Sequence, residues 1–135
     1  MTALSLLKSK DEVTYLYADS TIRQGLEKMK FHRYSALPVI TKEGVYVGCI
    51  SEGDFLWYIM EHDLKEAEEE SILKIIRPQF NPAASIQISI TDLLTKAKQQ
   101  NFIPIIDDRH IFIGMITRRD IIDYFEKLYL KTDIA

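Results

Sequence analysis

The sequence predicts an α+β fold with an α/β-like order of elements, in which one β-α-β-β-α unit occurs twice and helices cover small sheets. A pattern of glycine, two apolar residues, a hydroxyl, two variable residues and aspartate stands at residues 48–54 and again at 114–120. From residue 34 onward the two halves align without a gap, at the 66-residue spacing from Gly48 to Gly114. Helix-like and strand-like apolar patterns also follow the same order in each half.

Each unit opens with a short extended segment, predicted at residues 13–17 and 85–88, and a helix follows it. Apolar residues recur at helical spacing in both helices. They are Ile22, Gly25, Leu26 and Met29 in the first half and Ile90, Leu93, Leu94 and Ala97 in the second. The hydroxyl side chains of Ser20, Thr21 and Ser89 are suitable N-caps for these helices.

Two strands and a second helix complete each unit. The strands are predicted at residues 36–40 and 45–50 in the first half and at 102–106 and 111–116 in the second. A polar turn joins each pair. The second helix begins near Glu52 or Arg118, and apolar residues mark one face of it.

The expected organisation is a first repeat at residues 1–62, a charged linker at 63–70 and a second repeat at 71–135, which together form one module. A charge run like that of the linker is usually a solvated helix. Residues 71–77 predict a short helix that ends before Pro78.

Composition excludes several classes of protein. The chain has 135 residues, of which 47% are hydrophobic and 27% charged, as expected for an ordered globular module. A net charge of −3 argues against general electrostatic binding to nucleic acid. One cysteine allows no intramolecular disulfide, and no leader-like segment or apolar run of membrane-spanning length is present. We therefore expect a cytoplasmic protein without nucleic-acid or membrane partners.

The repeated pattern carries the candidate chemistry. Ser51 and Thr117 fall where a strand becomes a helix, and free N–H groups at a helix start favour an anion such as phosphate. Asp54 and Asp120 lie one turn later, where a carboxylate can accept two hydrogen bonds from a ribose diol. The glycine before each hydroxyl leaves room for a close approach. The structural alternative is a capping box, with the hydroxyl at the N-cap and the acidic residue three positions on.

The doubled pattern, with a proline-containing strand ten residues upstream of each copy, resembles a pair of CBS domains, the Bateman module. The matching segments are residues 36–40 with 48–54, and 103–107 with 114–120. The resemblance implies a pseudo-twofold module with two clefts that hold adenosine nucleotides: AMP, ADP, ATP, S-adenosylmethionine or cyclic di-AMP. It also implies a homodimeric sensor that regulates another protein, not an enzyme, with the nucleotide as a regulatory ligand and no required cofactor.

The resemblance implies a role for several further residues. Aspartate would bind ribose and the hydroxyl phosphate, while backbone near the first strand of each unit would hold adenine and a residue before each first helix would line the cleft. The expected ligand-binding residues are Thr21, Tyr34, Ser35, Ala36, Pro38, Ser51, Asp54, Ser89, Asn101, Phe102, Ile103, Pro104, Thr117, Arg118, Arg119 and Asp120.

The two sites are not equal in sequence. Glu52 follows the first hydroxyl and would repel phosphate, whereas Arg118 and Arg119 follow the second and would attract it. We therefore expect the second site to be the better one, although pairing across the pseudo-twofold could instead aim the arginines at the first cleft. A pair that binds no ligand and serves in dimerisation or protein docking is the alternative function.

Other reactive residues give no second candidate site. His32, His62 and His110 are scattered without metal-ligand spacing, so no metal site is expected. Cys49 lies in a predicted buried strand, which favours packing over nucleophilic use. No catalytic constellation is visible.

Overall fold

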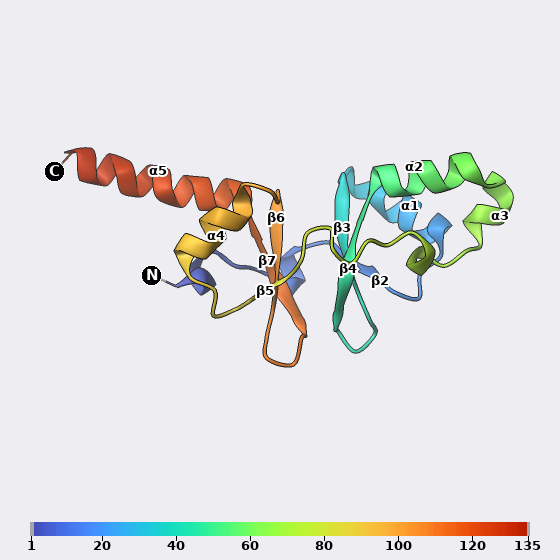
Figure 1. Ribbon diagram of the computed structural model, residues 1–135, viewed down its shortest axis with the longest axis horizontal. Coiled ribbons are helices and arrows are strands. Elements are labelled where there is room, and N and C mark those ends of the chain that lie inside the picture. The colour runs from blue at the N-terminus through green and yellow to red at the C-terminus, as the bar shows by residue number, and fades with distance from the viewer. Residues whose placement is uncertain (1, 135) are drawn as a thin grey trace.

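The computed structural model describes residues 2–134, with side chains through residue 131, and it confirms the predicted α+β architecture. Two sheets stand beside each other at the centre, and the helices lie on their outer sides (Figure 1). The first half contains β2 (Leu16–Tyr17), α1 (Ile22–His32), β3 (Ala36–Ile40), β4 (Tyr46–Ser51) and α2 (Glu52–Glu61), and α3 (Leu64–Glu68) follows it. The second half contains β5 (Ala84–Ser85), α4 (Ile90–Ala97), β6 (Phe102–Ile106), β7 (Phe112–Thr117) and α5 (Arg118–Ile134).

The two sheets repeat one pattern. In each half the short first strand runs parallel to the second, and the second pairs antiparallel with the third, in the orders β2-β3-β4 and β5-β6-β7. The register is also the same, since Ala36 pairs with Ser51 and Phe102 with Thr117. The hydroxyl of each repeated pattern is therefore fixed at the end of a strand, directly before a helix.

The segments that precede each half are exchanged between the halves. The N-terminal 3-10 helix η1 (Ala3–Leu6) and strand β1 (Lys8–Ser9) join the second half, where Lys8 pairs with Met115. The 3-10 helix η3 (Ile72–Lys74) joins the first half, where Arg77 pairs with Cys49. Because Cys49 and Met115 are equivalent in the repeat, Lys8 and Arg77 occupy equivalent places.

This exchange explains the repeated glycines. A Cβ on Gly48 would lie 2.9 Å from the Cα of Pro78, and a Cβ on Gly114 would collide with the carbonyl oxygen of Lys8. Real Cβ atoms essentially never lie within 3.0 Å of another heavy atom outside the adjacent residues. The polypeptide of the exchanged segment, and not a ligand, therefore makes the close approach at these glycines.

Each half has its own core, and an exchanged segment contributes to each. Ile72 is fully buried with Ile22, Leu37, Ile50 and Phe55 of the first half. Ala3, with Leu6 and Leu7 at its edge, packs into the second half's cluster around Leu93, Ile103, Ile105, Ile116 and Ile121. The core of each half therefore depends on a segment that lies next to the other half in the sequence.

The helix that forms within residues 71–77 is shorter than the predicted one, so the predicted length is wrong. Only one 3-10 turn forms, at Ile72–Lys74. The residue before a proline is driven toward extended backbone, and Arg77 precedes Pro78. Extended backbone also lets the Arg77 N–H donate to the carbonyl of Cys49 at 3.4 Å, which adds this segment to the sheet edge.

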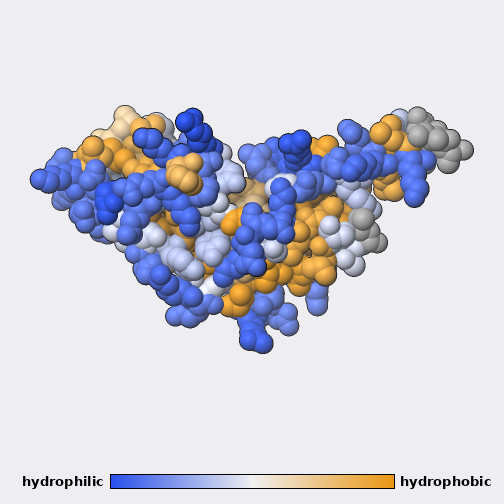
Figure 2. All heavy atoms as spheres, turned by 180° about the vertical axis from the view of Figure 1, so that it is seen from behind, coloured by the Kyte–Doolittle hydropathy of each residue, from blue (hydrophilic) through white to orange (hydrophobic). Residues whose placement is uncertain are grey.

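The hairpin tips connect the halves. The N–H of Tyr46 donates to the carbonyl of His110 at 3.2 Å, and the N–H of Phe112 donates to the carbonyl of Gly44 at 2.8 Å. The opposite ends of the sheets, where β4 and β7 lead into helices, leave a notch in the outline of the molecule (Figure 2). Within the described residues, no helix is long and apolar enough to cross a membrane.

Candidate functional site: two clefts between the repeats

Two cavities lie between the halves, and the beginnings of β3 and β6 line both of them. Tyr34 and Ala36 from the first half, and Asn101 and Phe102 from the second, contribute to each cavity. The polypeptide at these four positions is therefore shared, as a ligand platform between two repeats requires. The cavities differ in which hydroxyl of the repeated pattern they contain.

The cavity that contains Thr117, here called the Thr117 cleft, has a volume of about 240 Å³. Pro38 is the other predicted residue in its lining. Four further residues come from β1 and from the segment between β1 and β2, which the sequence did not single out as part of a site: Lys8, Glu12, Val13 and Thr14. Lys8 also lines an adjoining cavity of about 430 Å³ that contains Asp120. Lys8 thus lines both the cavity that contains the hydroxyl of the second pattern and the one that contains its carboxylate.

The cavity that contains Ser51, here called the Ser51 cleft, has a volume of about 480 Å³. Its predicted residues include Ser35 and Arg118. Glu52 lines it as well, together with Phe80 and Asn81 from the segment after η3. A negative and a positive side chain therefore face the same space.

The other predicted residues stand outside both linings, and Asp54 is one of them, beside Ser51 but not in the lining of the Ser51 cleft. Thr21 and Ser89 cap α1 and α4, where their hydroxyls accept hydrogen bonds from the N–H groups three positions on. Ile103 and Pro104 are buried within β6. Arg119 is exposed on the first turn of α5.

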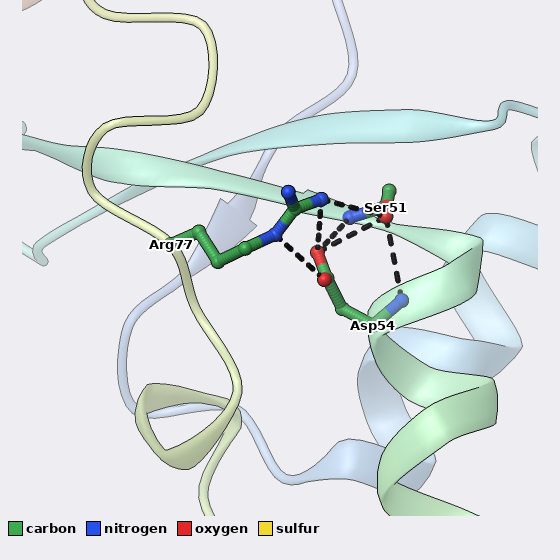
Figure 3. Close-up of polar contacts among 3 residues, drawn as sticks. All are labelled: Ser51, Asp54 and Arg77. Atoms are coloured by element: carbon green, nitrogen blue, oxygen red, sulfur yellow. Dashed lines mark hydrogen bonds and ion pairs between the residues drawn. The ribbon is translucent and has the colours of Figure 1, made fainter.

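The first pattern is closed by an ion pair that the sequence did not reveal (Figure 3). The Nε of Arg77 lies 2.7 Å from Oδ1 of Asp54, and its terminal nitrogen donates to Oδ2 at 3.2 Å. Oδ2 also accepts from the backbone N–H of Ser51 at 2.8 Å and from its hydroxyl at 3.0 Å. The capping box expected as the structural alternative is therefore present here, with an arginine added to it.

The second pattern is more open. The hydroxyl of Thr117 accepts from the N–H of Asp120 at 3.2 Å. The carboxylate of Asp120 lies 3.9 Å from the ammonium of Lys8, at the limit of an ion pair, and its side chain is 33% exposed against 11% for Asp54. The carboxylate and the hydroxyl of this pattern consequently keep the capacity to bind another molecule.

Arg118 lies in the Ser51 cleft and not beside Thr117. Its Nε donates to the carbonyl of Ala97 at 2.7 Å, at the end of α4, and its backbone N–H donates to the carbonyl of Asn101 at 2.8 Å. The cation beside Thr117 is Lys8. The pairing of the repeats thus separates the second hydroxyl from the arginine that follows it in sequence.

The buried polar residues near the Ser51 cleft are structural. The hydroxyl of Tyr46 donates to the carbonyl of Asn81 at 2.8 Å, and the amide of Asn81 lies 3.9 Å from the Sγ of Cys49. Burial raises the pKa of the Cys49 thiol to about 12. A thiol that stays protonated is a poor nucleophile, so Cys49 contributes to packing and not to chemistry. Within the part of the chain that the structure describes, no group of three or more His, Cys, Asp or Glu side chains could hold a metal ion.

Comparison with known proteins identifies the architecture. The family model of the CBS domain matches residues 7–61 and again residues 81–127. The chain belongs to the CBS-domain family. It is a tandem pair, since both repeats match and the structure superposes on CBS-pair proteins over its whole length.

The similar proteins include ligand-bound structures. The CBS pair superposes on the crystal structure of CbpB in complex with c-di-AMP with a TM-score of 0.90, at 25% identity over 100% of this chain and 91% of that one. CbpB from Streptococcus agalactiae gives a TM-score of 0.85 at 26% identity, over 95% of this chain and 82% of the other. An uncharacterised protein of Methanocaldococcus jannaschii, MJ1426, is 25% identical over 80% of this chain and 83% of its own length.

Proposed function

We propose that this CBS pair is a regulatory module, and not an enzyme, that binds an adenosine nucleotide in the Thr117 cleft and passes the signal to a partner protein. The observation that carries the proposal is the grouping of Thr117, Asp120 and Lys8, with both the hydroxyl and the carboxylate still able to bind. Cyclic di-AMP is the first candidate, because CbpB was crystallised with it. AMP, ADP, ATP and S-adenosylmethionine are the others.

Each residue of this group has a role set by its chemistry. The Asp120 carboxylate would accept both ribose hydroxyls of a mononucleotide, or the one free 2′-hydroxyl of a cyclic di-AMP ribose, and the Thr117 hydroxyl would donate to a phosphate oxygen. The Lys8 ammonium would supply a charge-assisted contact to the same phosphate. Adenine would lie against the strand starts that line both clefts, at Tyr34 and Ala36 and at Asn101 and Phe102, where backbone groups and the Phe102 ring are available. We expect these contacts to supply most of the affinity.

The size of the Thr117 cleft restricts how the ligand sits. Pockets that enclose a small ligand usually measure about 300–1,000 Å³, and this cleft has about 240 Å³. A nucleotide must therefore extend from the cleft past Lys8 into the adjoining cavity that contains Asp120. Adenine in the cleft and ribose-phosphate toward Asp120 is the arrangement that fits these two spaces.

We propose further that the pair works as a homodimer. Exposed apolar residues stand on both helices that follow the two patterns: Leu56, Trp57 and Met60 on α2, and Ile122, Leu128, Tyr129 and Leu130 on α5. Exposed apolar surface commonly marks a protein interface. If the pair binds no nucleotide, this surface supports the alternative function, a dimerisation or docking module.

A thermal-shift screen tests the proposal. The candidate nucleotides are each added at about 1 mM, and a ligand at 100 times its dissociation constant adds about 2.7 kcal/mol to the free energy of unfolding. The binder is then titrated into Asp120→Asn, which we expect to weaken binding by roughly ten- to a hundredfold, about 1.4–2.8 kcal/mol. Glu126→Gln, on the exposed surface of the same helix, is the matched control. No shift with any nucleotide would favour the docking function.

A further inference from the structure

We propose that Arg77 closes the Ser51 cleft to nucleotide, so that the two clefts are inequivalent and Arg77 determines which one is filled. The inference rests on the proposed function and adds a residue that controls it. The repeat makes each group in one cleft the counterpart of a group in the other, so the two patterns can be compared atom by atom.

The hydroxyl of Ser51 has no capacity left for a ligand. A serine hydroxyl offers one donor and two acceptor sites. It donates to Oδ2 of Asp54 at 3.0 Å, and it accepts from the N–H of Asp54 at 3.3 Å and from Arg77 at 3.2 Å. All three sites are used. Among the described residues, the Thr117 hydroxyl has one hydrogen bond, which it accepts from the N–H of Asp120, so its own proton is available for a phosphate oxygen.

The carboxylate of Asp54 is occupied in the same way. An ionised carboxylate has about four acceptor sites, and Asp54 receives two hydrogen bonds from Ser51 and two contacts from the forked guanidinium of Arg77. A ribose hydroxyl would have to displace Arg77. Lys8, the counterpart of Arg77, has no fork and reaches Asp120 at 3.9 Å. Arginine holds a carboxylate with a fixed pair of donors, whereas a lysine ammonium on a flexible stem yields more easily.

The surroundings hold Arg77 in place. Its guanidinium lies 4.3 Å from the centre of the Phe80 ring, and Phe80 itself lines the Ser51 cleft. Its backbone N–H donates to the carbonyl of Cys49, and Pro78 restricts the backbone of Arg77, the residue before it. The closed arrangement in Figure 3 is therefore supported by the Phe80 ring and by the backbone that carries Arg77.

Titration calorimetry with cyclic di-AMP tests the inference on four proteins: the wild type, Asp54→Asn, Asp120→Asn and Arg77→Lys. We expect Asp54→Asn to leave the wild-type affinity unchanged, and Asp120→Asn to weaken it at least tenfold. Arg77→Lys installs the residue found in the open cleft, and we expect it to double the number of nucleotide molecules bound per chain. Arg23→Lys, an exposed arginine that pairs with Glu27 on α1, is the control and should change nothing.

The outcomes separate the inference from the function on which it rests. If Asp54→Asn weakens binding as much as Asp120→Asn, or if Arg77→Lys leaves the number of sites unchanged, the closure by Arg77 is wrong while nucleotide binding stands. If no protein of the set binds cyclic di-AMP, the proposed ligand is wrong and the inference falls with it. A double variant, Arg77→Lys with Asp120→Asn, should retain binding through the opened Ser51 cleft alone.

Discussion

Replacement of Ile72 by alanine tests the exchange of segments, on which the geometry of both clefts depends. Ile72 is separated from the first half by the charged linker, yet it is fully buried among that half's core residues. The change removes three methyl or methylene groups, each worth about 0.8 kcal/mol on burial. A residual cavity adds to this loss, because the neighbours relax only in part.

The structure indicates that the site cannot collapse freely. The Cγ2 atom of Ile72 lies 3.3 Å from where a Cβ on Gly25 would be, so the isoleucine fills the space that the glycine leaves. We therefore expect Ile72→Ala to lower the free energy of unfolding by about 3–4 kcal/mol, within the range of about 2–5 kcal/mol for such changes.

Urea denaturation followed by far-ultraviolet circular dichroism measures this difference. Leu73→Ala is the matched control, because Leu73 is the next residue and is 50% exposed. We expect the control to cost less than about 1 kcal/mol. Equal losses for the two variants, or a loss below about 1 kcal/mol for Ile72→Ala, would refute the exchanged arrangement.

Two other predictions follow from the packing and from the buried thiol. Gly25→Ala should destabilise the protein by about 1 kcal/mol in the same denaturation experiment, because a Cβ at this position would lie 2.9 Å from the buried Phe55 ring. Overpacking costs about 1–3 kcal/mol and outweighs the gain of about 1 kcal/mol in helix propensity. A variant more stable than the wild type would show that the Phe55 ring can move. Burial raises the pKa of the Cys49 thiol from its ordinary value of 9.0 to about 12 in the folded protein. Its contribution to stability is therefore full below pH 9 and is lost by about 1.4 kcal/mol per pH unit as the pH rises toward 12. The wild type should lose stability relative to Cys49→Ala between pH 9 and 11, and parallel pH profiles of the two proteins would contradict this prediction.

The elements were predictable because the repeat supplied each of them twice. The strands at 36–40 and 102–106 have the predicted bounds, and those that follow them start one residue later than expected. The short strands are less complete than predicted, because only two residues of each pair with the neighbouring strand: β2 is the end of the predicted segment 13–17, whereas β5 at Ala84–Ser85 shares only Ser85 with the predicted segment 85–88. Local apolar patterns determine such elements, so one sequence suffices for them.

The residues that distinguish the clefts were not predictable in the same way. Lys8 and Arg77 acquire their roles through the exchange of segments, which places each beside a pattern in the distant half. A signal was present: Leu-Leu-Lys at 6–8 matches Ile-Ile-Arg at 75–77, two apolar residues and then a cation. Arg118 follows the alternative that the sequence left open, since its neighbour in sequence is Thr117 and yet pairing across the pseudo-twofold places it in the lining of the Ser51 cleft. Sequence adjacency does not determine on which side of a shared interface a side chain lies.

The structure of the CBS pair crystallised with the nucleotide selected in the screen tests the central claim most directly. The account predicts a ribose on the Asp120 carboxylate and a phosphate against Thr117 and Lys8, while Arg77 still holds Asp54. A nucleotide bound at Ser51 with Arg77 displaced, and the Thr117 cleft empty, would contradict it.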